Sequence, residues 1–265
     1  MELYVQRFTV KEHNEEDYKE DLGTTKKLIE SMGIKNILRF LIFVVLGVNT
    51  FANECENQQS FAARVRSKAP SFKAKAVIND SFTDIHFKTY QEKGQWTVLL
   101  FYPFDYTFVC PTEIISYSNA FQSFEELNTK VLAISTDSHH THLAWTRAKR
   151  EDGGVGKLNI PLVADTAGTI SRAYGIYVSD ENDEMFGAAL RGLFIIDPVG
   201  KIRMTQINDD TVGRNVKETL RLLKGFQYSD SHVGEACPAS WEPGDDAIFA
   251  DPAGSKSYFS KHFTD

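Results

Sequence analysis

Short apolar segments alternate with amphipathic segments through the middle of this chain, and this alternation constrains the fold more than any other feature. The apolar segments are rich in β-branched and aromatic residues, which predicts buried strands at 96–102 (WTVLLFY), 130–136 (KVLAIST) and 160–165 (IPLVAD). The amphipathic segments have helical spacing and lie at 112–128, 139–150, 168–175 and 215–227. Before the last of these, 191–207 breaks at Pro198-Val199-Gly200 into the two strands of a hairpin.

This order of elements predicts an α/β fold with a mixed central sheet and helices on both faces. Strand, helix, strand, helix, strand, strand and helix follow one another in the order that the thioredoxin fold uses. We place this thioredoxin-like domain at residues 74–227. An extended, polar C-terminal arm follows at 228–265, where Pro238, Pro243 and Pro252 mark turns.

The N-terminal region differs in composition from the rest and predicts three segments: a polar extension at 1–31, a signal peptide at 32–52 and a linker at 53–73. The signal peptide has a basic start, nine apolar residues at Phe40–Val48 and a small-residue cleavage site at Thr50-Phe51-Ala52. Nine residues fall short of the roughly 20 that span a bilayer, which favours a cleaved leader over an anchor. A core helix of the folded domain is the alternative. Either Met32 is the functional start, or the leader is unusually long.

Composition limits the classes of partner. A net charge of −7 argues against binding to nucleic acid or to an anionic membrane, because both require basic surface. The hydrophobic share of 42% is ordinary for a globular protein, and no Gly-rich phosphate loop is present. The predicted leader favours the secretory pathway, either the endoplasmic reticulum lumen or the exterior, over the cytoplasm. In that compartment Asn79 of Asn79-Asp80-Ser81 would become a glycan acceptor.

Cys55, Cys110 and Cys237 are too far apart in sequence for a zinc motif, and an odd number leaves at least one free or paired with another chain. Cys110 lies in 101–113 (FYPFDYTFVCPTE), between a predicted strand and a predicted helix. The positive end of a helix favours an anion there, a nearby arginine would add to this effect, and Pro111 suits a first helical turn. These features favour a reactive thiolate, and a buried, inert thiol is the alternative.

Segment 101–113 resembles the active-site signature of the typical two-cysteine peroxiredoxins, with Pro103, Thr107 and Cys110 at the family's spacing. The resemblance covers residue 74 to the C-terminus and continues through THLAWTR, GGVGKLNIPLVAD, LRGLFIID, VGRNVKETLRLL, GEACPASWEPGDD and KSYFSKHF. The DPAGSKSYF ending, the leader and the upstream Cys55 are most similar to the secretory-pathway branch, peroxiredoxin IV. The resemblance implies a peroxidase without a cofactor.

The resemblance also implies a role for each residue around Cys110. Cys110 would attack a peroxide oxygen, become a sulfenic acid and release water or an alcohol. The Thr107 hydroxyl, with a backbone amide, would orient the peroxide, and Pro103 would shield the pocket from water. Arg191 would hold the thiolate, because fixed donors stabilise the charge that develops on the oxygens. The carboxylate of Glu113 would position the arginines, which include Arg214 as well as Arg191.

Cys237, in GEACPASW, matches the family's resolving cysteine. In the family this thiol comes from the other subunit of an antiparallel dimer and condenses with the sulfenic acid after both segments unwind. A structural disulfide within one chain is the alternative. Gly153–Gly156 and Tyr258–Phe259 match elements that pack over the active site and slow this unwinding, which predicts sensitivity to over-oxidation. Cys55 would bridge dimers within a decamer or be an incidental thiol.

The expected function is reduction of hydrogen peroxide and small alkyl hydroperoxides, in antioxidant defence and redox signalling, with thioredoxin or a protein disulfide isomerase restoring the thiols. We expect a homodimer that assembles into a decamer and has no membrane contact after signal cleavage. An oligomeric holdase chaperone or a peroxide-relay scaffold is the alternative. A thioredoxin-like disulfide exchanger is disfavoured, because the chain contains no Cys-x-x-Cys.

Three further features qualify the resemblance. His139, His140 and His142 would suit a metal, but the family also has histidine before Leu-Ala-Trp, and we expect no metal site. Segment Ser179–Ala189 is longer and more acidic than its family counterpart, which would alter access to the pocket or contacts between subunits. Asp210-Thr211 replaces the usual Leu-Pro before VGR.

Overall fold

The computed structural model describes residues 63–263. The polar extension, the predicted signal peptide and Cys55 lie outside the described residues. Within the described part, no helix combines the length and the apolar character that crossing a membrane requires.

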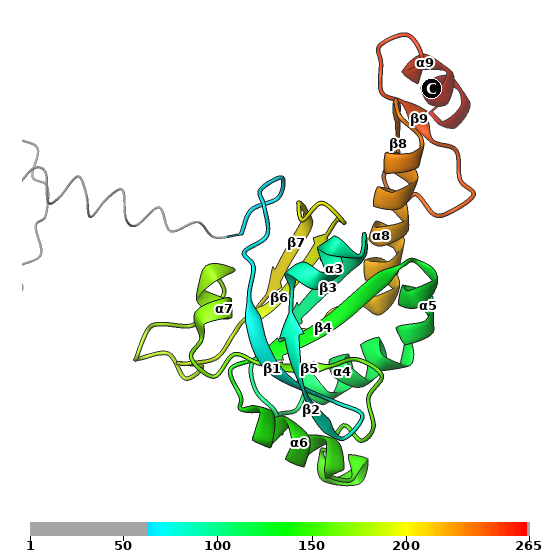
Figure 1. Cartoon of the computed structure of the whole chain (residues 1–265). Coiled ribbons are helices and arrows are strands. Elements are labelled where there is room, and N and C mark those ends of the chain that lie inside the picture. The colour runs from blue at the N-terminus through cyan, green and yellow to red at the C-terminus, as the bar shows by residue number, and fades with distance from the viewer. Residues whose placement is uncertain (1–62, 264–265) are drawn as a thin grey trace, which may run out of the picture. The chain divides into compact units, whose positions relative to one another are not determined.

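Seven strands form one mixed sheet (Figure 1). They are β1 Lys73–Ile78, β2 Ser81–His86, β3 Trp96–Phe101, β4 Thr129–Ser135, β5 Leu162–Ala164, β6 Arg191–Ile196 and β7 Ile202–Asn208. Their order across the sheet is β2-β1-β5-β4-β3-β6-β7. The central strands β3, β4 and β5 are parallel, and the pairs β1–β2, β1–β5, β3–β6 and β6–β7 are antiparallel. The predicted mixed sheet is therefore confirmed.

Helices cover both faces of this sheet. They are α3 Lys88–Glu92, α4 Cys110–Asn119, α5 Phe121–Glu126, α6 His139–Arg147, α7 Thr169–Ala173 and α8 Val216–Ser231, with a short 3-10 helix at Arg150–Asp152 after α6. Side chains of β3 point alternately to the two faces. Val98 and Leu100 pack into one core with α4, α5, α6 and α8, whereas Leu99 and Phe101 pack into the other with α3 and α7. This arrangement confirms the thioredoxin-like α/β fold.

Before β5 the structure differs from the sequence-based expectation in the short helix α3, which was not predicted, and in two larger features. The first is the β1–β2 hairpin, which was not predicted: Asn79 and Asp80 have positive φ angles of 49° and 60°, the geometry of a tight two-residue turn. The second is the predicted helix 112–128, which is divided into α4 and α5. The packed body also begins ahead of β1, since the Arg66 backbone N–H donates to the Ile202 carbonyl at 2.8 Å.

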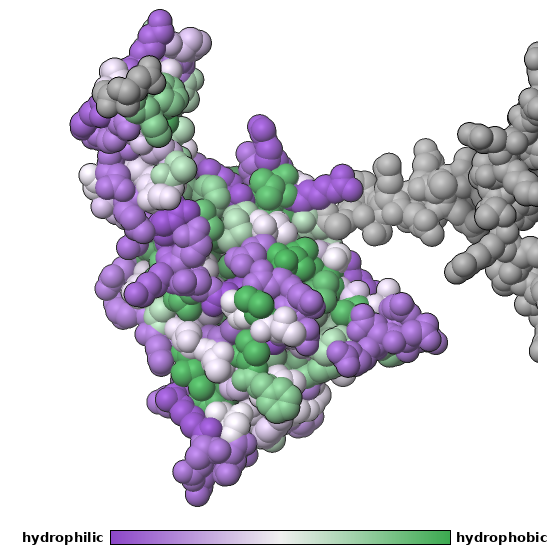
Figure 2. Space-filling view, turned by 180° about the vertical axis from the view of Figure 1, so that it is seen from behind, coloured by the Kyte–Doolittle hydropathy of each residue, from purple (hydrophilic) through white to green (hydrophobic). Residues whose placement is uncertain are grey.

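The C-terminal arm contains β8 (Glu235–Ala236), β9 (Ile248–Phe249) and α9 (Ser255–His262). β8 and β9 pair with each other and form a sheet of their own. Figure 1 shows α9 at the tip of the arm, beyond the end of α8. Phe249, Phe259 and Phe263 are exposed in this region, and Figure 2 shows hydrophobic surface at the tip. The arm therefore carries uncovered apolar side chains away from the main sheet.

Candidate active site

Cys110 is the first residue of α4 and directly follows the loop 102–109 that leaves β3. Pro111 occupies the second helical position. A backbone N–H in this first turn would have no partner within the helix, so the missing N–H of proline costs nothing there. The Cys110 side chain is fully buried. The positive end of the helix dipole favours negative charge on the sulfur. The predicted position of Cys110 at a helix start is confirmed.

Arg191 faces this sulfur from the neighbouring strand. It is the first residue of β6, which pairs antiparallel with β3 and therefore starts beside the loop that carries Cys110. Arg191 Nη1 lies 3.3 Å from Cys110 Sγ and also donates to Glu113 Oε2 at 2.8 Å. Its Nε donates to the Asp210 carbonyl at 2.6 Å. The guanidinium group is thus held from two sides with one nitrogen directed at the sulfur.

Glu113, one turn after Cys110 on α4, binds the second arginine as well. Its Oε1 accepts hydrogen bonds from the Arg214 backbone N–H and Nε, both at 2.7 Å, and its Oε2 accepts one from Nη2 at 2.9 Å. Arg214 Nη1 donates to the carbonyls of Phe101 and Gly192 at 2.7 Å each. Burial by itself raises the pKa of Glu113, but the hydrogen bonds and charge of Arg214, with the charge of Arg191, lower it below its ordinary value.

This cluster consists of one carboxylate and two guanidinium groups. All three are buried, since Glu113, Arg191 and Arg214 are each less than a tenth exposed. It therefore has an excess of one positive charge beside the sulfur. A thiolate at Cys110 balances that charge, whereas a neutral thiol leaves a buried cation without a counter-ion. The arrangement suits a nucleophilic sulfur next to fixed hydrogen-bond donors.

The loop before Cys110 carries the two other predicted site residues. Pro103 is buried, two residues after the end of β3. Thr107 is half-buried, and its hydroxyl donates to the Phe104 carbonyl at 3.0 Å. Tyr106, between them, has a φ of 56° and is about half exposed. The loop therefore contains a left-handed turn immediately before Thr107.

Cys237 belongs to a different part of the molecule, directly after β8 in the arm. Its thiol donates to the Gly225 carbonyl of α8 at 3.5 Å and lines a cavity of about 270 Å³ between α8 and the segment 236–240. Burial raises the pKa of this thiol, and the charge of Arg221 opposes the rise. Cys110 and Cys237 are both free thiols in this structure.

The glycine-rich segment Gly153–Gly156 packs against the end of α6. The Gly153 carbonyl accepts a hydrogen bond from Trp145 Nε1 at 2.8 Å. A Cβ atom on Gly154 would lie 2.3 Å from the Ala148 carbonyl oxygen, so only glycine allows this approach. The neighbouring Val155 is fully buried. The segment is therefore a packed turn with defined contacts.

The three histidines of α6 have different environments. The rings of His139 and His140 lie 4.2 Å apart, next to the Phe82 ring. His142 is fully buried, and its Nδ1 lies 2.8 Å from Asp105 Oδ2. Among the described residues, no group of three histidine, cysteine or acidic side chains is arranged to hold a metal ion. Sequence reasoning missed the pairing of His142 with Asp105, because the two residues share no local pattern.

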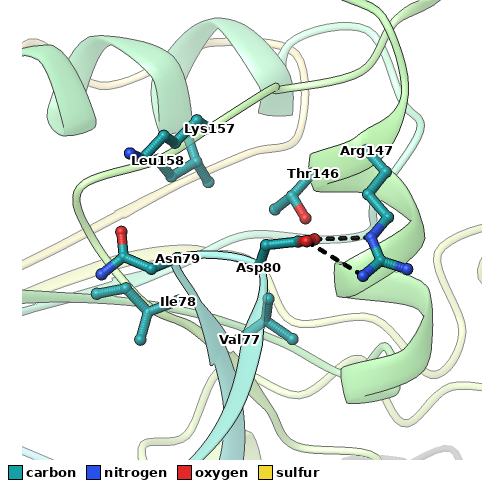
Figure 3. Close-up of a pocket in the computed structure, with 8 residues that line it drawn as sticks. All are labelled: Val77, Ile78, Asn79, Asp80, Thr146, Arg147, Lys157 and Leu158. Atoms are coloured by element: carbon teal, nitrogen blue, oxygen red, sulfur yellow. Dashed lines mark hydrogen bonds and ion pairs between the residues drawn. The ribbon is translucent and has the colours of Figure 1, made fainter.

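A separate cavity of about 360 Å³ lies between the β1–β2 turn and the end of α6 (Figure 3). Asp80 and Arg147 face each other across its rim, with Arg147 Nε 2.7 Å from Asp80 Oδ1. Lys157 and Leu158 line another side. The residues around Cys110 do not line this cavity, so it is distinct from the cluster described above.

Comparison with known proteins relates this geometry to a family. Residues 65–205 match the model of the AhpC/TSA family, and residues 225–261 match the C-terminal domain of 1-Cys peroxiredoxin. Peroxiredoxin-2 of Macaca fascicularis is 50% identical over 200 residues, which are 76% of this chain and 97% of that protein. Peroxiredoxin-4 of Bos taurus is 48% identical over 199 residues, which are 75% of this chain and 70% of that protein. The chain is thus about equally similar to these two relatives.

Solved structures agree with this relationship. The reduced 2-Cys peroxiredoxin of Plasmodium vivax has a TM-score of 0.69 and 35% identity, and the match covers 74% of this chain and 98% of that one. Thioredoxin peroxidase I of Plasmodium yoelii has a TM-score of 0.58 and 36% identity, with 68% of this chain and 100% of that one covered. The first family match includes the Cys110 loop and Arg191, and the second includes Cys237. This chain belongs to the AhpC/TSA family of peroxiredoxins, which are thiol-dependent peroxidases.

Proposed function

We propose that Cys110 is the cysteine of this peroxidase that reacts with peroxide. Its thiolate attacks one oxygen of hydrogen peroxide or of a small alkyl hydroperoxide, so that an S–O bond forms and the O–O bond breaks. The leaving oxygen takes up a proton and departs as water or an alcohol, and the sulfur is left as a sulfenic acid. The observation that carries the proposal is the 3.3 Å contact between Arg191 Nη1 and a buried sulfur at a helix start.

In this proposal the neighbouring residues have separate tasks. Arg191 stabilises the thiolate and then the charge that moves to the leaving oxygen, because donors fixed in a buried site stabilise a transition state strongly. Glu113 and Arg214 hold Arg191 in place through the hydrogen bonds described above. The Thr107 hydroxyl turns from the Phe104 carbonyl to the bound peroxide, and Pro103 excludes water from the pocket.

We further propose that Cys237 of a second chain resolves the sulfenic acid. Its sulfur attacks Cys110 sulfur, a disulfide forms, and the hydroxyl leaves as water after protonation. The support is the position of Cys237 in an arm that projects from the main sheet, where its thiol is free. A dithiol protein, thioredoxin or a disulfide-isomerase-type protein, then reduces the disulfide. The homodimer would assemble into a decamer, with Cys55 as a bridge between dimers.

Non-reducing electrophoresis after one equivalent of peroxide tests this cycle. In a Cys55→Ser background, which removes the bridge between dimers, the chain is expected to give a covalent dimer, and adding Cys110→Ser or Cys237→Ser is expected to give monomer. The chain with all three cysteines is the control and is expected to give larger covalent species as well. Absence of the dimer from the Cys55→Ser chain, with a dimer retained in Cys237→Ser alone, would assign resolution to Cys55. Peroxide consumption by Cys110→Ser at the wild-type rate would refute the role of Cys110.

For location, we propose entry into the secretory pathway. The support is the run of nine apolar residues at Phe40–Val48 behind two basic residues, together with 48% identity to Peroxiredoxin-4 of Bos taurus. Expression of the full chain in a eukaryotic cell, followed by N-terminal sequencing of the product, tests this location. A product that begins near Ala52 and fractionates with the endoplasmic reticulum or the medium is expected. An uncleaved cytoplasmic product would contradict the proposal.

A further inference from the structure

Asp105 and His142 form a buried ionisable pair that the chemistry above does not use. The Asp105 side chain is 1% exposed and that of His142 is 0% exposed, and Oδ2 lies 2.8 Å from Nδ1. A carboxylate only accepts hydrogen bonds, so Nδ1 carries the proton and donates. Asp105 Oδ1 accepts a second bond from the Tyr102 hydroxyl at 2.8 Å. Burying such groups has a cost in free energy, so the question is what the pair holds in place.

The pair holds the loop that connects β3 with Cys110. The Asp105 backbone N–H also donates to Asp137 Oδ2 at 2.9 Å, which ties the same residue to the end of β4. The next residue, Tyr106, has a φ of 56°, a conformation that costs about 1–3 kcal/mol for a residue other than glycine. Tyr106 is half exposed, so burial of its own side chain does little to impose that conformation. The contacts of Asp105 therefore hold the turn, together with the Trp145 ring, which lies 6.1 Å from the Tyr106 ring.

The backbone turn at Tyr106 determines where the next residue, Thr107, lies. The Thr107 hydroxyl donates to the carbonyl of Phe104, the residue directly before Asp105. A loop released at Asp105 moves both this carbonyl and the backbone of Thr107. The cation cluster around the sulfur is built from other elements, since Glu113 lies on α4, Arg191 on β6 and Arg214 just before α8. The described hydrogen bonds of that cluster do not include Asp105 or His142.

We propose that Asp105 and His142 are positioning residues, which hold the turn at Tyr106 and thereby direct the Thr107 hydroxyl towards the peroxide. This inference rests on the proposed role of Cys110 and Thr107. It separates two properties of the site. The thiolate depends on the cation cluster, whereas the orientation of the peroxide depends on the buried pair on α6 and the loop.

Two reactions of the same sulfur distinguish these properties. Iodoacetamide alkylates the thiolate and has no need of the Thr107 hydroxyl, whereas peroxide requires both. Both second-order rate constants are measured in a Cys55→Ser, Cys237→Ser background, in which Cys110 is the remaining cysteine. For Asp105→Ala and His142→Leu we expect the peroxide rate constant to fall about 10- to 100-fold, as when a positioned donor is lost. The alkylation rate constant should change less than about twofold, which is below 0.5 kcal/mol.

Matched variants control for simple loss of packing. His142→Asn keeps an N–H donor near the position of Nδ1, so it should recover most of the peroxide rate that His142→Leu loses. His140→Leu makes the same substitution at an exposed position of the same helix and should leave both rates unchanged. If Asp105→Ala does not fold, the His142 series provides the same comparison. In a Thr107→Val background, His142→Leu should cost less than about twofold in the peroxide rate, because both changes remove one function.

Equal losses in the two rates would overturn the inference, because they would mean that the pair supports the thiolate or the fold. Full additivity with Thr107→Val, or an unchanged peroxide rate in His142→Leu, would also overturn it. Failure of the proposed function has a different signature. In that case Cys110→Ser would consume peroxide as fast as its parent, whatever the state of Asp105 and His142.

Discussion

Arg191 Nη1 lies 3.3 Å from Cys110 Sγ, although the two residues are 81 positions apart in sequence. The fold brings them together because β6 pairs antiparallel with β3, so that the start of β6 meets the end of β3. The same nitrogen is 2.8 Å from Glu113 Oε2. The Arg191 guanidinium group thus connects the Cys110 sulfur to the Glu113 carboxylate, which lies one turn after Cys110 on α4. Catalysis and stability of this site are therefore coupled, and the predictions below separate them.

Arg191→Lys tests the geometric contribution of the guanidinium group. A lysine keeps one positive charge but cannot donate to Cys110, Glu113 and the Asp210 carbonyl from a fixed plane. We expect the second-order rate constant for peroxide to fall about 100-fold, which is the scale for loss of one fixed donor. Competition for hydrogen peroxide against a peroxidase of known rate measures it. Arg172→Lys, at a surface position on α7, is the control, and a wild-type rate in Arg191→Lys would contradict the assignment.

Glu113→Gln tests what holds the two arginines in the interior. The substitution leaves Arg191 and Arg214 buried side by side without a carboxylate. Breaking a buried ion pair at one partner typically costs about 3–5 kcal/mol, so the free energy of unfolding should fall by that amount. Urea denaturation measures it. Glu151→Gln removes an exposed ion pair with Lys149 and should leave the urea midpoint unchanged. A small effect of Glu113→Gln would mean that the carboxylate is dispensable.

The pH dependence of stability should identify Glu113 as well. Its pKa is lowered in the folded protein, since the hydrogen bonds and charges of Arg214 and Arg191 outweigh the opposing effect of burial. A carboxyl group with a lowered folded pKa contributes stability above its unfolded pKa of about 4.3, and this contribution is lost as pH falls through the folded value. The difference in unfolding free energy between wild type and Glu113→Gln should therefore be constant from pH 7 to about pH 5 and shrink below it. A difference that grows in acid would contradict the ionised state of Glu113.

Hydrophobic patterns predicted the central part of the fold well, because these strands are buried on both faces. β3 and β4 lie within one residue of the segments predicted at 96–102 and 130–136. The β1–β2 hairpin was missed, since β1 has the mixed sequence KAKAVI, in which Lys73 and Lys75 are exposed. Its signal was Asn79-Asp80, two residue types that adopt positive φ angles in tight hairpin turns.

The site was predictable to the extent that it lies in a local motif. Pro103, Thr107, Cys110 and Glu113 fall within eleven consecutive positions, and the family signature indicated them together. The contact between Asp105 and His142 joins residues 37 positions apart, and no periodicity relates them. Asp210-Thr211 stands where the family usually has Leu-Pro. The contact to Arg191 Nε is made by the backbone carbonyl of residue 210, so this change of side chains does not remove it. Pairings of this kind become visible only when the chain is folded.

The resolution step proposed for Cys237 requires that its segment be released from α8. α8 holds the segment around Cys237 through the Tyr228 hydroxyl, which donates to Glu235 Oε2 at 2.6 Å, and through the Trp241 ring, 5.0 Å from the Tyr228 ring. In the proposed cycle, this segment leaves α8 before Cys237 reaches the sulfenic acid of another chain. While it stays bound, a second peroxide can oxidise the sulfenic acid to sulfinic acid. The contacts of Tyr228 thus compete with resolution.

Tyr228→Phe removes one charge-assisted hydrogen bond from this contact, which is worth about 1.5 kcal/mol or more. Release of the segment should therefore become about tenfold faster, and disulfide formation with it, if release limits the rate. The dose of peroxide that inactivates half of the enzyme should rise in parallel. Tyr174→Phe removes a hydroxyl bonded to the Pro70 carbonyl in the other core and should change neither quantity. Time-resolved non-reducing electrophoresis measures the first quantity, and mass spectrometry of the sulfinic acid measures the second. Slower disulfide formation in Tyr228→Phe would mean that the hydroxyl guides Cys237 to its target instead of retaining it.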